Sequence, residues 1–164
     1  MGFPFLLDAP PSKLDSSVLL CTDASDLGFG GHFGPCWFSY PWMQGEKDKF
    51  PIFYRELYAI IAAMSTFGNQ WKGKIIHFYT DSANAIVAAK KMTSRNAAMM
   101  HLLRHLHTLC VDFGCHIWFD YINTKANGPA DSLSKLNLQK FRRQMPHALS
   151  TPSPLLRSLP SHPW

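Results

Sequence analysis

Residues 17–42 read SVLLCTDASDLGFGGHFGPCWFSYPW, and this stretch decides the fold class. It begins with a short apolar run, residues 17–22, which ends at Asp23. Two aromatic runs spaced by glycine follow, over residues 28–34 and 35–42. Apolar and aromatic runs separated by Gly and Pro are typical of β-strands joined by tight turns. We therefore predict three strands in an antiparallel meander.

Helices and strands alternate after the meander. Apolar spacing, capping residues and chain breakers predict helices over residues 54–67, 83–91, 96–113 and 129–136, and strands over residues 74–80 and 115–122. Strands that alternate with helices pair in parallel through right-handed crossovers. The predicted fold class is therefore α/β, with one mixed five-stranded sheet (three antiparallel strands, then parallel ones) and helices on its faces.

The length of 164 residues suits one domain with flanking segments. Residues 1–15 are Pro-rich without periodicity and are predicted to be a leader or linker, and residues 16–138 are predicted to form the domain. Residues 139–164 are Pro-rich and basic and are predicted to be a tail. Apolar residues make up 46% of the chain and charged residues 16%, which indicates a globular protein and excludes a disordered one.

Several function classes are excluded by composition. The longest apolar run, residues 57–64, is too short to span a bilayer, and residues 1–7 lack the basic region and cleavage site of a secretory signal. The four cysteines form no CxxC pair. We expect an intracellular protein, cytoplasmic or nuclear, that is not secreted and does not bind membranes. The net charge of +5 is concentrated in the second half of the chain, which suits a polyanion partner and, equally, simple solubility.

Four carboxylates mark the ends of predicted elements. Asp23 and Asp81 end the first and fourth strands, Glu56 lies near the start of the first helix, and Asp131 opens the last helix. Each alone has an ordinary explanation as a helix cap or as a charge near a helix N-terminus. Together they can meet at one end of the sheet, where sites in α/β proteins assemble. Clustered carboxylates repel each other unless a divalent cation is present, and oxygen ligands favour Mg²⁺ or Mn²⁺ over zinc.

Short motifs surround these carboxylates. They are Thr22-Asp23-Ala24-Ser25 with Gly28 and Gly30, Arg55-Glu56-Leu57 with Trp71, Thr80-Asp81-Ser82, and Ala130-Asp131-Ser132-Leu133-Ser134-Lys135. In this order and on these elements they resemble the ribonuclease H domain of retroelement reverse transcriptases, most closely the DIRS-type (tyrosine-recombinase) retrotransposon group. The resemblance covers about residues 16–138 and implies a ribonuclease H-like fold.

The sequence departs from that family at a few positions. Asn123 and Thr124 stand where the family often has Pro-Gly, and Lys135 stands in place of Arg. Residues 123–129 contain no His, whereas cellular members usually carry one before the last Asp. Retroelement members often lack this His, so its absence does not indicate an inactive enzyme.

The resemblance implies endonucleolytic hydrolysis of the RNA strand of RNA–DNA hybrids with two Mg²⁺ ions, for which Mn²⁺ can substitute. Asp23 would bridge both ions, Asp131 would complete the shell of one, and Glu56 and Asp81 would complete that of the other. One ion would activate a water molecule and the other would stabilise the leaving 3′ oxygen. The hybrid would be distinguished by its 2′-hydroxyl groups.

Other residues are expected to contact the sugar and phosphate groups of the hybrid, which positions a duplex without reading its sequence. They are Ser25, Gly28, Ser82, Asn84, Lys90, Lys91 and Arg95. The last three are a small counterpart of the basic protrusion of some cellular members, or else an ordinary solvated helix end.

Two functions remain open from the sequence. The first is an active ribonuclease, and the second is a non-catalytic remnant of the same fold that binds nucleic acid. The four intact carboxylates favour the first. The sequence has no polymerase motif, so the polymerase and recombinase parts of a retroelement polyprotein are expected partners besides the hybrid. A zinc site at His101 and His105 is disfavoured because nearby Cys110 falls on the opposite, apolar side of the predicted helix.

Overall fold

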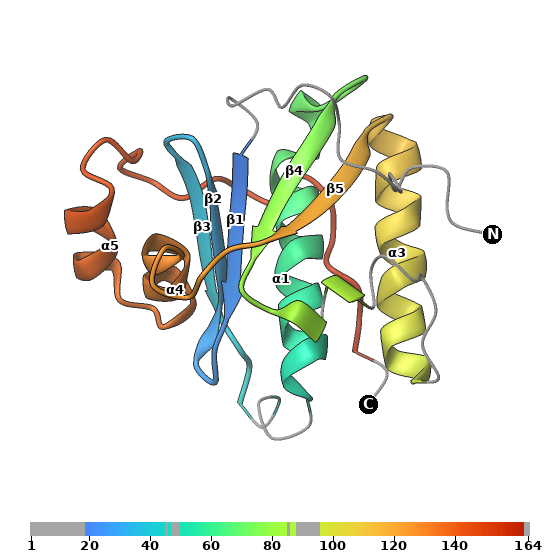
Figure 1. Ribbon diagram of the computed structural model, residues 1–164, viewed down its shortest axis with the longest axis horizontal. Helices are drawn as coiled ribbons and strands as arrows, with labels where there is room; N and C mark the ends of the chain where they lie inside the picture. Colours follow the sequence, from blue (N-terminus) through green and yellow to red (C-terminus); the bar gives the residue numbers. More distant parts are fainter. Residues whose placement is uncertain (1–18, 45, 47–49, 85, 88–95, 163–164) are drawn as a thin grey trace.

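A computed structural model describes residues 19–44, 46, 50–84, 86–87 and 96–162 of the chain (Figure 1). Its strands are β1 (Leu19–Ala24), β2 (Gly28–Phe33), β3 (Cys36–Pro41), β4 (Ile75–Thr80) and β5 (His116–Tyr121). They form one sheet in the order β3-β2-β1-β4-β5. The first three strands pair antiparallel, and β4 pairs in parallel with both β1 and β5. The predicted α/β class and the mixed five-stranded sheet are confirmed.

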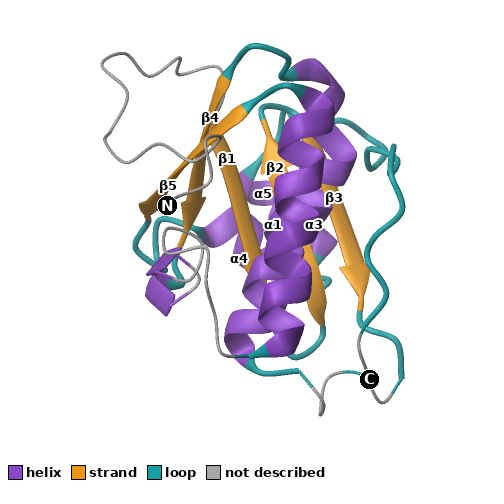
Figure 2. Cartoon of the chain, turned by 90° about the vertical axis from the view of Figure 1, so that its right-hand side faces the viewer, coloured by secondary structure: helices purple, strands orange, loops and turns teal. Residues whose placement is uncertain are grey.

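Helices cover both faces of this sheet. The described helices are α1 (Ile52–Phe67), the short 3-10 helix η2 (Gly68–Gln70), α3 (Ala97–Phe113), α4 (Gly128–Ser134) and α5 (Leu138–Gln144). The long helices α1 and α3 lie on one face, and the short helices α4 and α5 lie on the other (Figures 1 and 2). No helix among the described residues is long and apolar enough to cross a membrane.

The boundaries of the long helices have local causes. Helix α1 follows Pro51 and begins at Ile52, two residues before the predicted start. Helix α3 begins where the side chain of Asn96 accepts two backbone N–H groups, and it ends at Gly114, which has a left-handed φ of 64°. Of the helix predicted over residues 83–91, residues 83–84 and 86–87 are helical and the rest lie outside the described residues.

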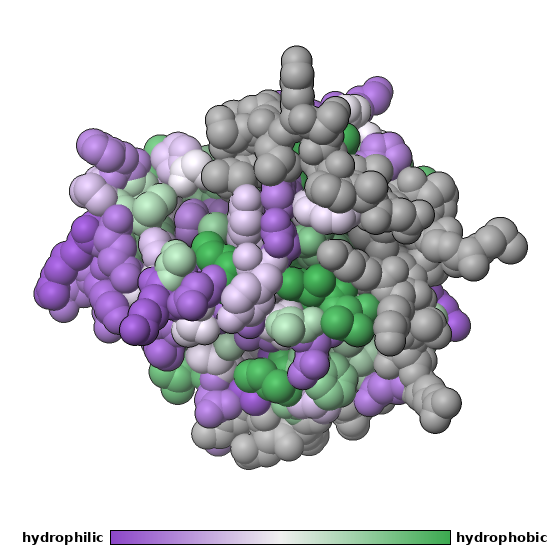
Figure 3. Space-filling view, viewed as in Figure 1, coloured by the Kyte–Doolittle hydropathy of each residue, from purple (hydrophilic) through white to green (hydrophobic). Residues whose placement is uncertain are grey.

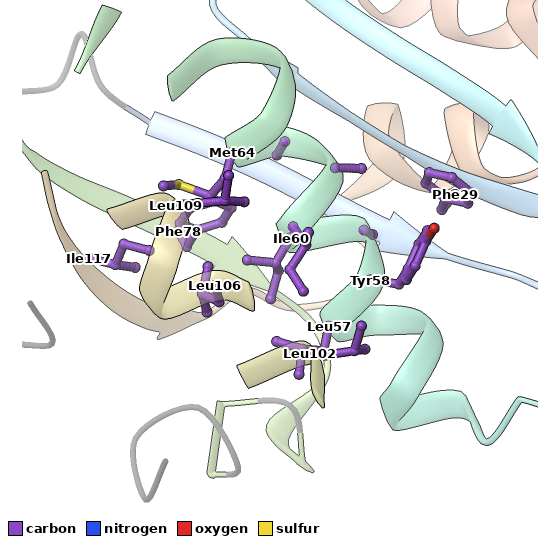
Figure 4. Packing of buried hydrophobic residues seen from close by; sticks show 14 of the residues in the cluster. Phe29, Leu57, Tyr58, Ile60, Met64, Phe78, Leu102, Leu106, Leu109 and Ile117 are labelled. Carbon is purple, nitrogen blue, oxygen red and sulfur yellow. The ribbon is translucent and has the colours of Figure 1, made fainter. Parts of the chain in front are cut away.

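The main core lies between the sheet and the two long helices (Figure 4). Side chains from α1, α3, β4 and β5 meet there, including Leu57, Ile60, Met64, Phe78, Leu102, Leu106 and Ile117. Helix α1 is buried on nearly all its sides, from Tyr54 to Phe67, because it is enclosed by the sheet, by α3 and by the end of the chain. This burial fixes the position of Glu56.

A smaller core lies on the opposite face, where Trp37, Leu133 and Phe141 pack together. Helix α4 approaches β2 closely here, because a Cβ atom added at Gly30 would lie 2.5 Å from the Leu133 Cβ. The glycine is therefore required by packing, and it brings α4 close to the end of β1.

The structure differs from the tail predicted for residues 139–164. Phe141 in α5 is fully buried, and beyond α5 the C-terminal segment, residues 145–162, is bonded to the domain. Its backbone donates from Ser153 to the Trp37 carbonyl and from Leu156 to that of Ser65. Proline prevents the C-terminal segment from forming a regular helix or strand. The other backbone N–H and C=O groups of the segment still form hydrogen bonds with the helices and strands that it covers.

Candidate metal centre

Asp23, Glu56 and Asp81 come together at one edge of the sheet. One oxygen of each carboxylate lies within 4.8 Å of the others. Asp23 is near the end of β1 and Asp81 directly follows β4, and the parallel pairing of these strands brings their carboxyl ends to the same edge. Glu56 reaches this edge from the second turn of α1. Three of the four predicted carboxylates thus form a single cluster.

Burial raises the pKa values of these carboxyl groups. Asp23 and Glu56 are only 5% and 4% exposed. Burial, opposed by a hydrogen bond from Ser134 and assisted by the charges of Asp81 and Asp131, raises the pKa of Asp23 to about 7. Burial and the charges of Asp23 and Asp81 raise the pKa of Glu56 to about 9. Asp81 is half-buried, and its pKa is also raised, chiefly by burial. In the absence of bound metal, the carboxyl cluster therefore retains protons near neutral pH.

Glu56 leaves one oxygen for a ligand. Its carboxylate accepts the backbone N–H of Ala24, but its buried Oε2 has no hydrogen-bond partner among the described residues. Buried carboxylate oxygens are normally paired, so an unpaired one beside two other carboxylates fits an oxygen-bound divalent cation. The donor set of three carboxylates suits Mg²⁺ or Mn²⁺.

Asp131 lies beside the cluster in the first turn of α4 and is close enough to raise the pKa values of Asp23 and Asp81. Its two oxygens, however, are 2.9 and 3.1 Å from the Lys135 Nζ. The Lys135 side chain is more than half exposed, so this ion pair contributes only about 0–1 kcal/mol and gives way readily to a bound cation. The structure places Asp131 at the site but in an ion pair.

Two residues of the site were not assigned from the sequence. Ser134 is fully buried, and its hydroxyl donates to Asp23 Oδ2 at 2.5 Å. It lies three residues after Asp131, hence on the same helix face, which is the signal that indicates its position. Thr124, one of the departures from the family pattern, makes a side-chain hydrogen bond to Asp81 that lowers the pKa of that carboxyl.

The predicted nucleic-acid contacts fall into three groups. The Ser25 hydroxyl donates to the Ser134 carbonyl at 2.8 Å, and a Cβ at Gly28 would lie 2.2 Å from the Tyr40 carbonyl oxygen, so both residues serve the packing of the fold. Ser82 and Asn84 follow Asp81 and are half-buried and exposed, respectively. The basic residues Lys90, Lys91 and Arg95 lie outside the described residues.

No family model matches the chain, and no curated protein matches it.

Proposed function

We propose that this chain is an endonuclease with a ribonuclease H-like fold that hydrolyses the RNA strand of RNA–DNA hybrids. The observation that carries the proposal is the convergence of Asp23, Glu56 and Asp81, each from a motif that resembles the retroelement family, at one edge of the sheet. The strand arrangement supports it, because three antiparallel strands followed by two parallel ones are what the resemblance implies.

Asp23, Glu56 and Asp81 would hold divalent cations, and Asp131 would join them once its ion pair with Lys135 opens. Bound Mg²⁺ or Mn²⁺, two ions by the resemblance, supplies the activation of water and the stabilisation of the leaving oxygen. The unpaired Oε2 of Glu56 and the mutual repulsion of the carboxylates are the features of this chain that fit such ions.

The protein contributes preorganisation. Asp23 is fixed by the hydroxyl of Ser134, and Asp81 is held by the side chain of Thr124. Carboxylates held in place before the substrate arrives need no reorganisation during the reaction. Ser82 and Asn84, beside Asp81, are the described residues best placed to contact the RNA backbone, whereas Ser25 and Gly28 support the fold.

The proposed partner is an RNA–DNA hybrid, inside the cell and together with the polymerase and recombinase parts of a retroelement polyprotein. The excess of basic residues in the second half of the chain supports a polyanionic substrate. The basic cluster of Lys90, Lys91 and Arg95 remains a proposed site for phosphate contacts.

A cleavage assay on labelled hybrid, duplex DNA and duplex RNA, with Mg²⁺ or with a chelator, tests this function. We expect cleavage of the RNA strand of the hybrid alone, only with metal, leaving 5′-phosphate ends. Asp23→Asn is the matched control, because it keeps the shape of the side chain and removes its charge. It should abolish cleavage without unfolding the protein. Metal-dependent cleavage of duplex DNA, or hybrid binding without cleavage, would contradict the proposal, and the second result would favour the non-catalytic remnant.

A further inference from the structure

A pocket of about 320 Å³ lies where the start of β2, the end of β3, helix α1 and the C-terminal segment meet. It is lined by Phe29, Tyr40, Pro41, Trp42, Met43, Glu46, Tyr58, Leu159 and His162. Its volume is in the range of small-molecule sites. None of these residues takes part in the proposed hydrolysis.

The inner wall of the pocket consists of fixed aromatic rings. The ring centroid of Phe29 is 4.6 Å from that of Trp42 and 5.4 Å from that of Tyr58, and Figure 4 shows Tyr58 of α1 pointing toward Phe29 of β2. Two polar groups of the wall are already bonded to the backbone, since Trp42 Nε1 donates to the Ser25 carbonyl and the Tyr58 hydroxyl donates to that of Pro160, both at 2.9 Å. The aromatic residues that line the pocket are Phe29, Tyr40, Trp42 and Tyr58, and the faces of aromatic rings attract cations.

One side of the pocket carries a negative charge. Glu46 accepts the Met43 N–H through Oε2 at 2.8 Å, and its Oε1 is 3.4 Å from His162 Nε2. Burial lowers the pKa of His162, and the neighbouring His101 lowers it further, against the opposite effect of Glu46. His162 Nδ1 lies 2.9 Å from the Tyr54 hydroxyl, so a neutral imidazole that accepts this hydrogen bond at Nδ1 carries its own proton on Nε2, on the side of Glu46. Glu46 is the acidic residue among the described residues that line the pocket.

The pocket thus combines aromatic walls with Glu46, and among the described residues that line it none is Lys or Arg and no other is acidic. Phosphates and carboxylates are repelled by Glu46, and a purely apolar ligand leaves its charge uncompensated. A cation with an apolar outer surface satisfies both parts of the site.

We propose that this pocket binds a trimethylammonium group, such as choline or a trimethylated lysine side chain carries. The methyl groups would pack on Phe29, Trp42 and Tyr58, and the positive charge would face Glu46. This site is independent of the proposed hydrolysis, so a failure of either proposal leaves the other unaffected.

Binding can be measured by titrating choline into the full chain while following the Trp42 indole N–H by NMR, with Trp42→Phe used only to assign the signal. The matched control ligand is the neutral carbon analogue in which a tert-butyl group replaces the trimethylammonium group. We expect the choline titration to shift the Trp42 signal, and the neutral analogue to bind about tenfold more weakly. Titration of trimethyllysine amide in parallel identifies the source of the group by its relative affinity.

The variant Glu46→Gln provides a second test of the proposal. It should weaken choline binding by about tenfold and leave the affinity of the neutral analogue unchanged. Equal affinities of the wild-type chain for choline and for the neutral analogue would overturn the proposal and leave only an apolar hollow. The absence of any Trp42 shift at saturating choline would also overturn it. Both of these outcomes are read from the wild-type chain and do not depend on the folding of a variant.

Discussion

At the residue scale, the acidic cluster opposes folding unless a cation is present. The pKa of Asp23 rises from 3.8 to about 7 on folding, and that of Glu56 rises from 4.5 to about 9. At pH values between the unfolded and folded pKa of each group, the folded state therefore retains a proton that the unfolded state has released. The free energy of unfolding of the metal-free protein should fall as the pH rises from about 4 through 9.

Metal should reverse this trend, because it binds the deprotonated carboxylates of the folded state only. We expect Mg²⁺ to raise the melting temperature by several degrees at pH 8 and by much less at pH 5. Thermal unfolding with Mg²⁺ or chelator at the two pH values measures this effect. In Asp23→Asn, the stability without metal should increase by roughly 1–2 kcal/mol at neutral pH. A Mg²⁺ shift of equal size at both pH values would show that these carboxylates do not hold the ion.

A second prediction at the residue scale concerns the hydroxyl of Ser134 and the affinity of the cluster for metal. Its removal in Ser134→Ala frees the Asp23 carboxylate from its hydrogen bond, and loss of such supporting contacts typically weakens metal binding by about tenfold or more. Ser132→Ala is the matched control, because Ser132 is also buried in α4 but bonds to Gln144 instead. Titration of Mn²⁺ followed by melting temperature distinguishes them. Equal losses in both variants would indicate a general weakening of α4.

At the element scale, the contact between α4 and β2 positions Asp131 and Ser134 beside Asp23. Gly30→Ala places a methyl group 2.5 Å from the Leu133 Cβ and should push the two elements apart. We expect a loss of about 1–3 kcal/mol in stability together with weaker metal binding. Gly34→Ala is the control, since a Cβ there has nothing within 4 Å and only the left-handed φ of 56° opposes it. If Gly30→Ala lowered stability and left the metal affinity intact, α4 would not be part of the site.

Sequence reasoning succeeded for elements with a clear period and failed where the signal is not periodic. The apolar spacing of α1 and α3 and the aromatic runs of β2 and β3 predicted these elements to within a few residues. Asp23 and Asp81 were found because they lie at the ends of strands that the fold aligns, and Glu56 and Asp131 because they lie near the starts of helices. The role of Gly30 could not be predicted, because it depends on which helix packs against it. The C-terminal segment has no period, and its bonds to Trp37 and Ser65 are visible only in three dimensions.

At the scale of the whole molecule, hydrophilic side chains gather at the α5 end, as Figure 3 shows, while the C-terminal segment leads from α5 across to α1. Along this path Arg157 pairs with Asp112 of α3 at 3.2 Å, and Tyr58 bonds to Pro160. The segment therefore connects the two helical layers around the edge of the sheet. None of these bonds involves a carboxylate of the site or a residue that bonds to one, so stability and activity can be separated by shortening the chain.

A chain that ends at Thr151 should lose stability without losing the proposed activity. It lacks the backbone bonds of Ser153 and Leu156 and the cover over Tyr58, which together should lower the free energy of unfolding by on the order of 2–3 kcal/mol. Cleavage of hybrid at low temperature should persist, because the carboxylates are held by β1, β4, α1 and α4. Urea unfolding and the cleavage assay measure the two effects, with a chain ending at His162 as control. An unchanged unfolding midpoint would show that the segment does not stabilise the domain, and lost cleavage in a folded truncated chain would place part of the site in it.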